Sequence, residues 1–177
     1  GSLAGEYAAY QAVFEQTGVI EVQTLDALIN TAWALGVQPL PAGNNVAIAT
    51  NAGGAAALLA DELAKNGYTL ARISPEIQAE LRTKLNPSAQ VANPVDMLGQ
   101  AEPKDYAWSL ANLIKEPAVD VLVPILVPQA LVDTLGVAKA WVEAAQQTEK
   151  TMLTCLVGER STREANAFLN ASGVPVF

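Results

Sequence analysis

The chain has 177 residues, of which 51% are hydrophobic and 16% are charged, and its net charge is −8. This length suits one domain with a sizeable core, and the composition is that of a globular protein. Ten basic residues, scattered along an acidic chain, do not form the basic surface that a nucleic-acid partner or an anionic membrane would need.

The residue counts exclude several kinds of chemistry within this chain. It contains no histidine, so histidine general bases, histidine-dependent triads and histidine-containing zinc sites are excluded. Its one cysteine, Cys155, lies in the apolar run 152–157, which favours a buried and inert thiol. Without cysteine pairs, a membrane span or a visible secretion signal, we expect a cytoplasmic protein.

The first 42 residues predict a helical segment that continues from a missing upstream domain. Apolar residues recur at helical spacing in 6–16 and in 24–35, and Gly18 and Gly36 end these helices. Residues 38–45 are rich in Pro, Gly and Asn and are typical of a linker or long turn. We expect the main domain to occupy residues 43–177.

Strands and helices alternate in this second part of the chain. The predicted strands are 46–50, 69–74, 90–95, 119–127, 152–157 and 174–177. The predicted helices are 54–66, 75–85 with Ser74 as N-cap, 103–115, 131–147 and 161–172. Pro124 cannot donate to a ladder, so we expect the strand 119–127 to end near Val123 or to bulge there.

This alternation, with near-continuous apolar strands, is typical of a parallel sheet that is covered on both faces. Right-handed crossovers then produce a doubly wound arrangement. We predict an α/β fold with a mostly parallel sheet of five to six strands, flavodoxin-like, in which 46–50 and 119–123 are central. Binding sites in such folds lie at the carboxyl ends of the strands.

The clearest candidate site is the loop Thr50-Asn51-Ala52-Gly53-Gly54, between the first sheet strand and its helix. Two glycines permit a sharp turn and leave the backbone amides uncovered. The helix that follows presents unpaired N–H groups and the positive end of its dipole, which favours an anion such as phosphate. The loop matches neither the Gly-x-Gly-x-x-Gly fingerprint nor a P-loop, and a tight structural turn is the alternative.

Two other loops follow predicted strands. Asn93 and Asp96, followed by Gly99, either line the crevice beside the glycine loop or order their own loop through Asx hydrogen bonds. Gly158 permits a turn after the strand 152–157, and Glu159 is either functional or a solvated charge. No metal site is indicated.

Four segments in order carry a resemblance to a known family: VAIATNAGG at 46–54, LARISPE at 70–76, NPVDMLG at 93–99 and GVPVF at 173–177. With them, the chain resembles the NDP-forming acyl-CoA synthetases, also called ADP-forming acetate–CoA ligases. It resembles in particular their flavodoxin-like domain related to the C-terminal domain of the succinyl-CoA synthetase β subunit. The resemblance covers essentially the whole chain.

The resemblance implies a role in making acyl-CoA from a carboxylic acid, CoA and ATP. The family works through an acyl phosphate and a phosphorylated histidine, which the N-termini of two power helices stabilise. The loop from Thr50 to Gly54 looks like the turn into one of these helices, so it would bind the phosphohistidine. The parent enzyme would use ATP, Mg and CoA, whereas this domain would bind no cofactor of its own and would hold no catalytic residue.

The chain also departs from the family pattern. The family's histidine lies in a His-Thr-Gly-Ser-Leu-Ala-Gly type motif, and residues 1–5 are similar only to its tail. The CoA-binding and ATP-grasp domains are missing, so they would be partner domains, and we expect the isolated chain to be inactive. One alternative is a regulatory synthetase-like module of a protein lysine acetyltransferase. Another is a plain receiver module, although the first strand lacks the acidic cluster that Mg²⁺-dependent phosphorylation needs.

Overall fold

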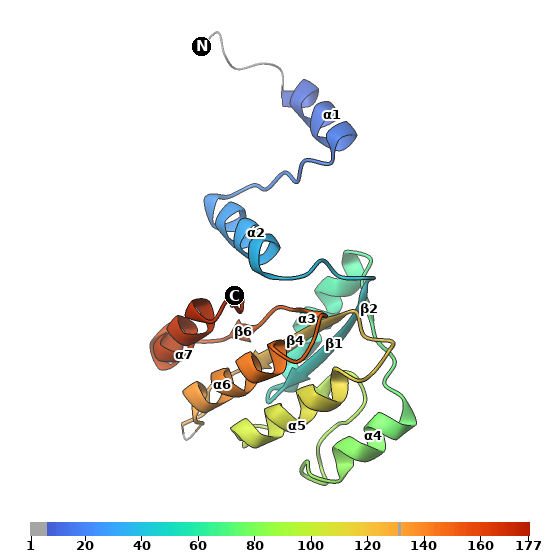
Figure 1. Cartoon of the computed structure of the whole chain (residues 1–177), viewed down its shortest axis with the longest axis vertical. Coiled ribbons are helices and arrows are strands. Elements are labelled where there is room, and N and C mark those ends of the chain that lie inside the picture. The colour runs from blue at the N-terminus through green and yellow to red at the C-terminus, as the bar shows by residue number, and fades with distance from the viewer. Residues whose placement is uncertain (1–6, 131) are drawn as a thin grey trace. The chain divides into compact units, whose positions relative to one another are not determined.

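The computed structural model describes residues 7–130 and 132–177. The chain forms two compact units, one up to Trp33 and one from Ala34 to Phe177. The first unit holds α1 (Tyr7–Thr17) and the start of α2 (Leu25–Val37), close to the predicted helices (Figure 1). Over their described residues, neither helix buries a side chain. The motif tail at residues 1–5 lies outside the described residues.

The second unit contains a six-stranded sheet whose strand pairs are parallel. The central strands are β1 (Asn45–Thr50) and β4 (Val121–Leu126), which pair from Val46–Val121 to Thr50–Ile125. β1 also pairs with β2 (Thr69–Leu70) and β3 (Val95–Asp96), and β4 pairs with β5 (Thr151–Met152) and β6 (Cys155–Leu156). The predicted parallel α/β fold and its two central strands are therefore confirmed.

The outer strands are shorter than predicted. Of the predicted strand 90–95, only Val95 belongs to β3, and Gln90 instead forms an isolated antiparallel bridge with Asp96. The predicted strand 174–177 is reduced to one parallel bridge between Thr154 and Val176. Apolar character alone did not separate residues that pair in the sheet from apolar residues that continue past it.

Five helices accompany the sheet. They are α3 (Gly53–Lys65), α4 (Pro75–Arg82), α5 (Pro103–Leu113), α6 (Thr134–Ala145) and α7 (Glu159–Ala171). The predicted cap of α4 is confirmed, because the Ser74 side chain accepts a hydrogen bond from the Ile77 N–H. α6 begins at Thr134 and not at residue 131, since Asp133 is its N-cap. Among the described helices, none is both long and apolar enough to traverse a bilayer.

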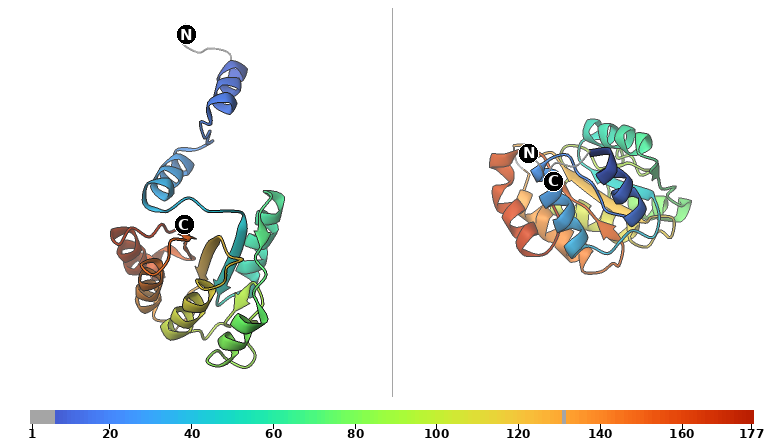
Figure 2. Two further views of the ribbon diagram at one scale, coloured as in Figure 1. Left: turned by 45° about the vertical axis from the view of Figure 1, so that its right-hand side comes forward. Right: turned by 90° about the horizontal axis from the view of Figure 1, so that it is seen from above.

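The two faces of the sheet bury different clusters because successive strand residues point to opposite sides. Ala47, Ala49 and Leu122 belong to the larger core, together with buried side chains of α4 to α7 such as Tyr106 and Trp141. Val46, Ile48 and Val121 belong to a smaller cluster with Ala56 of α3. The left view of Figure 2 shows α3 on one side of the strands and α5 and α6 on the other.

The expectation for Pro124 was wrong. β4 does not end at Val123 but runs through Pro124, which pairs with Ala49 of β1. The carbonyls of Leu122 and Leu126 accept hydrogen bonds from N–H groups on the side of β4 where β5 and β6 lie. Residues two positions apart in a strand point their backbone groups to the same side, so the nitrogen of Pro124 also faces that side. The ladder on that side is interrupted between β5 and β6, opposite Pro124, as the missing proline N–H requires, while the pairing with β1 on the other side stays continuous.

Candidate functional site

The glycine loop lies at the carboxyl edge of the sheet, where loops that follow the parallel strands gather. It begins at Thr50, the last residue of β1, and leads directly into α3. The loop after β3 lies next to it, because the Met97 N–H donates to the Thr50 carbonyl at 2.8 Å. The two loops therefore lie next to each other at this edge of the sheet.

The polar side chains of the loop are engaged within the protein. The Asn51 side chain is 2% exposed; its Nδ2 donates to the Val127 carbonyl at 2.8 Å and its Oδ1 accepts from the Val127 N–H at 2.9 Å. Thr50 is fully buried, and its Oγ1 accepts from the Ala52 N–H at 3.0 Å. These two side chains therefore hold the loop in place through hydrogen bonds within the protein.

The amino end of α3 is open. Its N-cap, Ala52, provides no side-chain hydrogen bond, and the Ala55 N–H is bonded to the Ala52 carbonyl at 3.1 Å. The N–H groups of Gly53 and Gly54 precede this first helical bond and belong to exposed residues. A Cβ placed on Gly54 would meet none of the described atoms within 4 Å. The Cβ side of Gly54 is therefore open.

The Gly53 side is occupied by Asp96. A Cβ on Gly53 would lie 2.7 Å from Asp96 Oδ2, so the carboxylate lies directly against this glycine. The other carboxylate oxygen, Oδ1, accepts from the Leu98 N–H at 2.9 Å. Asp96 thus both orders its own loop and borders the helix end.

Asn93 lies within the sheet and not at its edge. Its Oδ1 accepts from the Ile48 N–H at 3.0 Å, and its Nδ2 donates to the carbonyls of Val46 at 2.7 Å and Ala71 at 3.0 Å. The side chain thereby joins β1 to the residue after β2, where regular pairing has stopped. The structure gives Asn93 a bridging position in place of a contact with the glycine loop.

The remaining predicted residues lie in other loops. Gly99 borders a cavity of about 650 Å³ that is lined by residues 99–103 and by Gln129, Ala130, Val132 and Asp133, and a Cβ on Gly99 would lie 3.0 Å from Gln129 Nε2. Gly158 has a φ of 97° and its carbonyl accepts from the Thr162 hydroxyl. Glu159 is exposed at the start of α7, and no described hydrogen bond or ion pair joins it to the glycine loop.

Two titratable side chains near this edge are neutral at ordinary pH. Burial raises the pKa of Tyr106, whose hydroxyl donates to the Ile125 carbonyl at 2.8 Å, next to the end of β1. Partial burial likewise raises the pKa of the Cys155 thiol, but Cys155 is only partly buried, so the expectation of a buried cysteine was wrong. Tyr106 was not singled out from the sequence. Across the described residues, no group of three or more acidic or cysteine side chains could hold a metal ion.

Comparisons with known proteins place the chain in a family. Residues 46–177 match the Ligase-CoA domain. The alpha subunit of ADP-forming acetate–CoA ligase II from Pyrococcus furiosus is 37% identical over 181 residues, which cover 100% of this chain and 39% of that subunit. A crystal structure of a protein from Pyrococcus horikoshii OT3 has a TM-score of 0.91 and 38% identity, over 98% of this chain and 41% of that one.

Acetyl-coenzyme A synthetase 1 from Ca. Korarchaeum cryptofilum, solved in complex with phosphate and ADP, has a TM-score of 0.90 and 29% identity. It is matched over 99% of this chain and 38% of its own. The chain therefore spans about two fifths of the length of these relatives. The names of the relatives confirm the resemblance to the ADP-forming acetate–CoA ligases, and the chain belongs to the Ligase-CoA domain family.

Proposed function

We propose that this chain is a domain of an NDP-forming acyl-CoA synthetase and that it helps to stabilise a phosphohistidine while acyl-CoA is made from a carboxylic acid, CoA and ATP. The observation that carries this proposal is the uncapped amino end of α3 at the carboxyl edge of the sheet. Family membership supports the reaction class, because the relatives are named as ADP-forming acetate–CoA ligases.

The geometry suits a phosphoryl group. Phosphoryl oxygens are strong hydrogen-bond acceptors with negative charge, and the N–H groups and dipole at a helix start stabilise such a group. Gly53 and Gly54 carry no side chain over these amides, and the first turn of α3 itself has no acidic residue, although the Asp96 carboxylate lies against Gly53. Because Asp96 borders Gly53, the phosphoryl group would approach from the Gly54 side.

The other participants would come from outside this chain. The chain has no histidine, so the phosphorylated imidazole would belong to another part of the enzyme. The partner domains would be a CoA-binding domain and an ATP-grasp domain, and the parent would use ATP, Mg and CoA. One structural relative was solved in complex with phosphate and ADP. In this chain, the α3 end would act on the phosphoryl group alone.

The test is Gly54→Val in the whole synthetase that contains this chain. The branched side chain would enter the open space in front of the amides, while the described neighbours need not move. Loss of one charge-stabilising donor typically lowers a rate by about 10²–10³-fold, and we expect a decrease of that order in histidine phosphorylation and acyl-CoA formation. Gly53→Val is the poorer test, because its side chain would collide with Asp96.

Ala57→Val is the matched control, because it adds the same branched bulk to an exposed position one turn further along α3. We expect it to leave phosphorylation unchanged, with both variants checked by thermal melting. Undiminished phosphorylation in a folded Gly54→Val enzyme would leave the loop with a structural role only. A parent that acetylates protein lysines and forms no phosphohistidine would instead support the regulatory module.

A further inference from the structure

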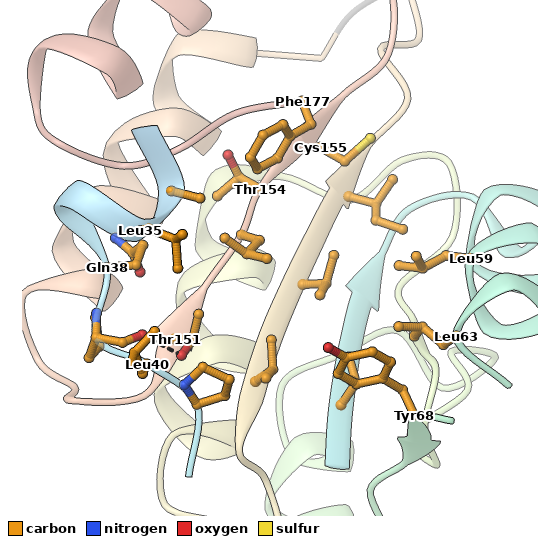
Figure 3. A pocket seen from close by; sticks show the side chains of 18 of the residues that line it. Leu35, Gln38, Leu40, Leu59, Leu63, Tyr68, Thr151, Thr154, Cys155 and Phe177 are labelled. Carbon is orange, nitrogen blue, oxygen red and sulfur yellow. Dashed lines mark hydrogen bonds between the residues drawn. The ribbon is translucent and has the colours of Figure 1, made fainter. Parts of the chain in front are cut away.

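An apolar groove of about 470 Å³ runs along the α3 face of the sheet. Figure 3 shows Leu59 and Leu63 of α3 on one side of it and Leu35 and Leu40 on the other. Its floor is formed by the central and outer strands, and its residues all belong to the second unit. The floor includes Val123, Cys155 and Val157.

Three polar side chains of the groove wall are bonded within the protein, whereas the Tyr68 hydroxyl makes no described hydrogen bond. Gln38 Oε1 accepts from the Met152 N–H at 2.9 Å, and the hydroxyls of Thr151 and Thr154 donate to the carbonyls of Pro39 and Pro175, both at 2.7 Å. Small-molecule sites usually combine apolar walls with a few free polar groups that orient the ligand. This groove therefore suits an apolar protein surface better than a nucleotide, a phosphate or CoA.

The groove also marks an incomplete layer. Parallel sheets are normally covered on both faces. Among the described helices of the second unit, α4 to α7 pack on one face, whereas α3 packs on the other. Val123 and Cys155 are only partly buried, and Val157 is 43% exposed. The uncovered strip lies between α3 and the segment 34–41, a place where a doubly wound sheet would carry another helix.

We propose that this groove is the docking site for an amphipathic helix from the part of the synthetase outside this chain. The chain spans about two fifths of its relatives, so most of such an enzyme is available to supply this helix. An apolar helix face would complete the second layer and would need no hydrogen bond from the wall. The inference rests on family membership and not on the phosphohistidine role of the α3 end.

Cys155 is a built-in probe of this docking, because it is the one cysteine of the chain and lines the groove. The experiment compares the rate of N-ethylmaleimide labelling of Cys155 in the isolated chain and in the whole synthetase at one pH, read by mass spectrometry of its peptide. We expect labelling to be at least about ten-fold slower in the whole synthetase, because the docked helix would cover Cys155 in most molecules at any moment. Equal rates would overturn the proposal.

Two variants of the whole synthetase sharpen the test. Val157→Lys places a charge in the groove and should restore fast labelling of Cys155, whereas Leu58→Lys, at a 74% exposed position outside the groove, should not. A concentration series of the isolated chain addresses a second copy: protection that rises with concentration would assign the groove to self-association and overturn the proposal. Histidine phosphorylation is not part of the readout, so failure here is separate from failure of the proposed function.

Discussion

Asn51 and Val127 are joined by two hydrogen bonds between a side-chain amide and a backbone amide, at 2.8 and 2.9 Å. Asn51 directly follows β1, and Val127 directly follows β4. The side chain thus continues the pairing of the two central strands by one further step beyond their ends. This clamp places the start of the glycine loop relative to the loop after β4.

Asn51→Ala should destabilise the fold. It leaves the N–H and carbonyl of Val127 without their partners in a region where Asn51 itself is buried. Buried groups left unsatisfied typically cost about 1–3 kcal/mol, and we expect a decrease of that size in the free energy of unfolding. Urea denaturation measures it as a lower midpoint with an unchanged slope. Asn66→Ala, which removes exposed hydrogen bonds, should change stability by less than about 0.5 kcal/mol. Equal effects of the two variants would contradict the clamp.

Glu116 should make stability depend on acid pH. Its buried carboxylate accepts from the N–H groups of Ser74 at 2.7 Å and Ala118 at 3.4 Å. Burial raises the pKa of Glu116, but the hydrogen bonds from Ser74 and Ala118, with the nearby Lys150 charge, lower the pKa by more, so the net shift is downward. A lowered folded-state pKa contributes stability above the unfolded value of about 4.3, and this is lost as pH falls through the folded pKa.

The test compares Glu116→Gln with the wild type by urea denaturation between neutral pH and about pH 3, across the unfolded-state pKa. The variant should be less stable at neutral pH, and the difference should shrink in acid, where the wild-type carboxylate becomes protonated. Glu149→Gln, at an exposed position, should differ little from the wild type across the same range. A difference that stays constant down to the lowest pH would show that the charge of Glu116 is not involved.

Gly54→Ala should stabilise the isolated chain, although Gly54→Val should impair the enzyme. Gly54 lies in the first turn of α3, where alanine restricts the unfolded chain and favours the helix by about 0.5–1 kcal/mol. Gly67→Ala should act in the opposite direction, because Gly67 has a φ of 79°. A Cβ at either position would meet none of the described atoms within 4 Å, so the contrast isolates backbone conformation. Thermal melting measures both, and shifts of the same sign would contradict the prediction.

Gly53 and Asp96 should be energetically coupled. Gly53→Ala would bring a methyl group to 2.7 Å from Asp96 Oδ2, so the carboxylate must move. In an Asp96→Ala background this obstacle is gone, and the cost of Gly53→Ala should be smaller by about 0.5–3 kcal/mol. The double-mutant cycle is measured by urea denaturation, with Gly54→Ala expected to have the same effect in both backgrounds. Additive effects of Gly53→Ala and Asp96→Ala would show that the carboxylate moves aside without a measurable cost in stability.

The sequence by itself determined the features that depend on neighbours along the chain. The apolar runs 46–50 and 119–127, separated by amphipathic helices, were enough to predict a parallel sheet and its two central strands. Ser74 was recognisable as a cap because its role involves a residue three positions away. The same locality made the turn at Gly53 and Gly54 visible, and with it the open helix end.

Only the tertiary structure decided the features that depend on which strands lie next to each other in the sheet. Pro124 is accommodated in a central strand because its missing N–H faces the gap between β5 and β6, while the pairing with β1 stays continuous. Asn93 bridges β1 to Ala71, and Asn51 clamps Val127, 76 positions along the chain. The approach of Asp96 to Gly53 likewise arises from the pairing of β3 with β1. Side-chain hydrogen bonds act over about 3 Å in space, and the distance along the chain between their partners is set by the order of strands in the sheet.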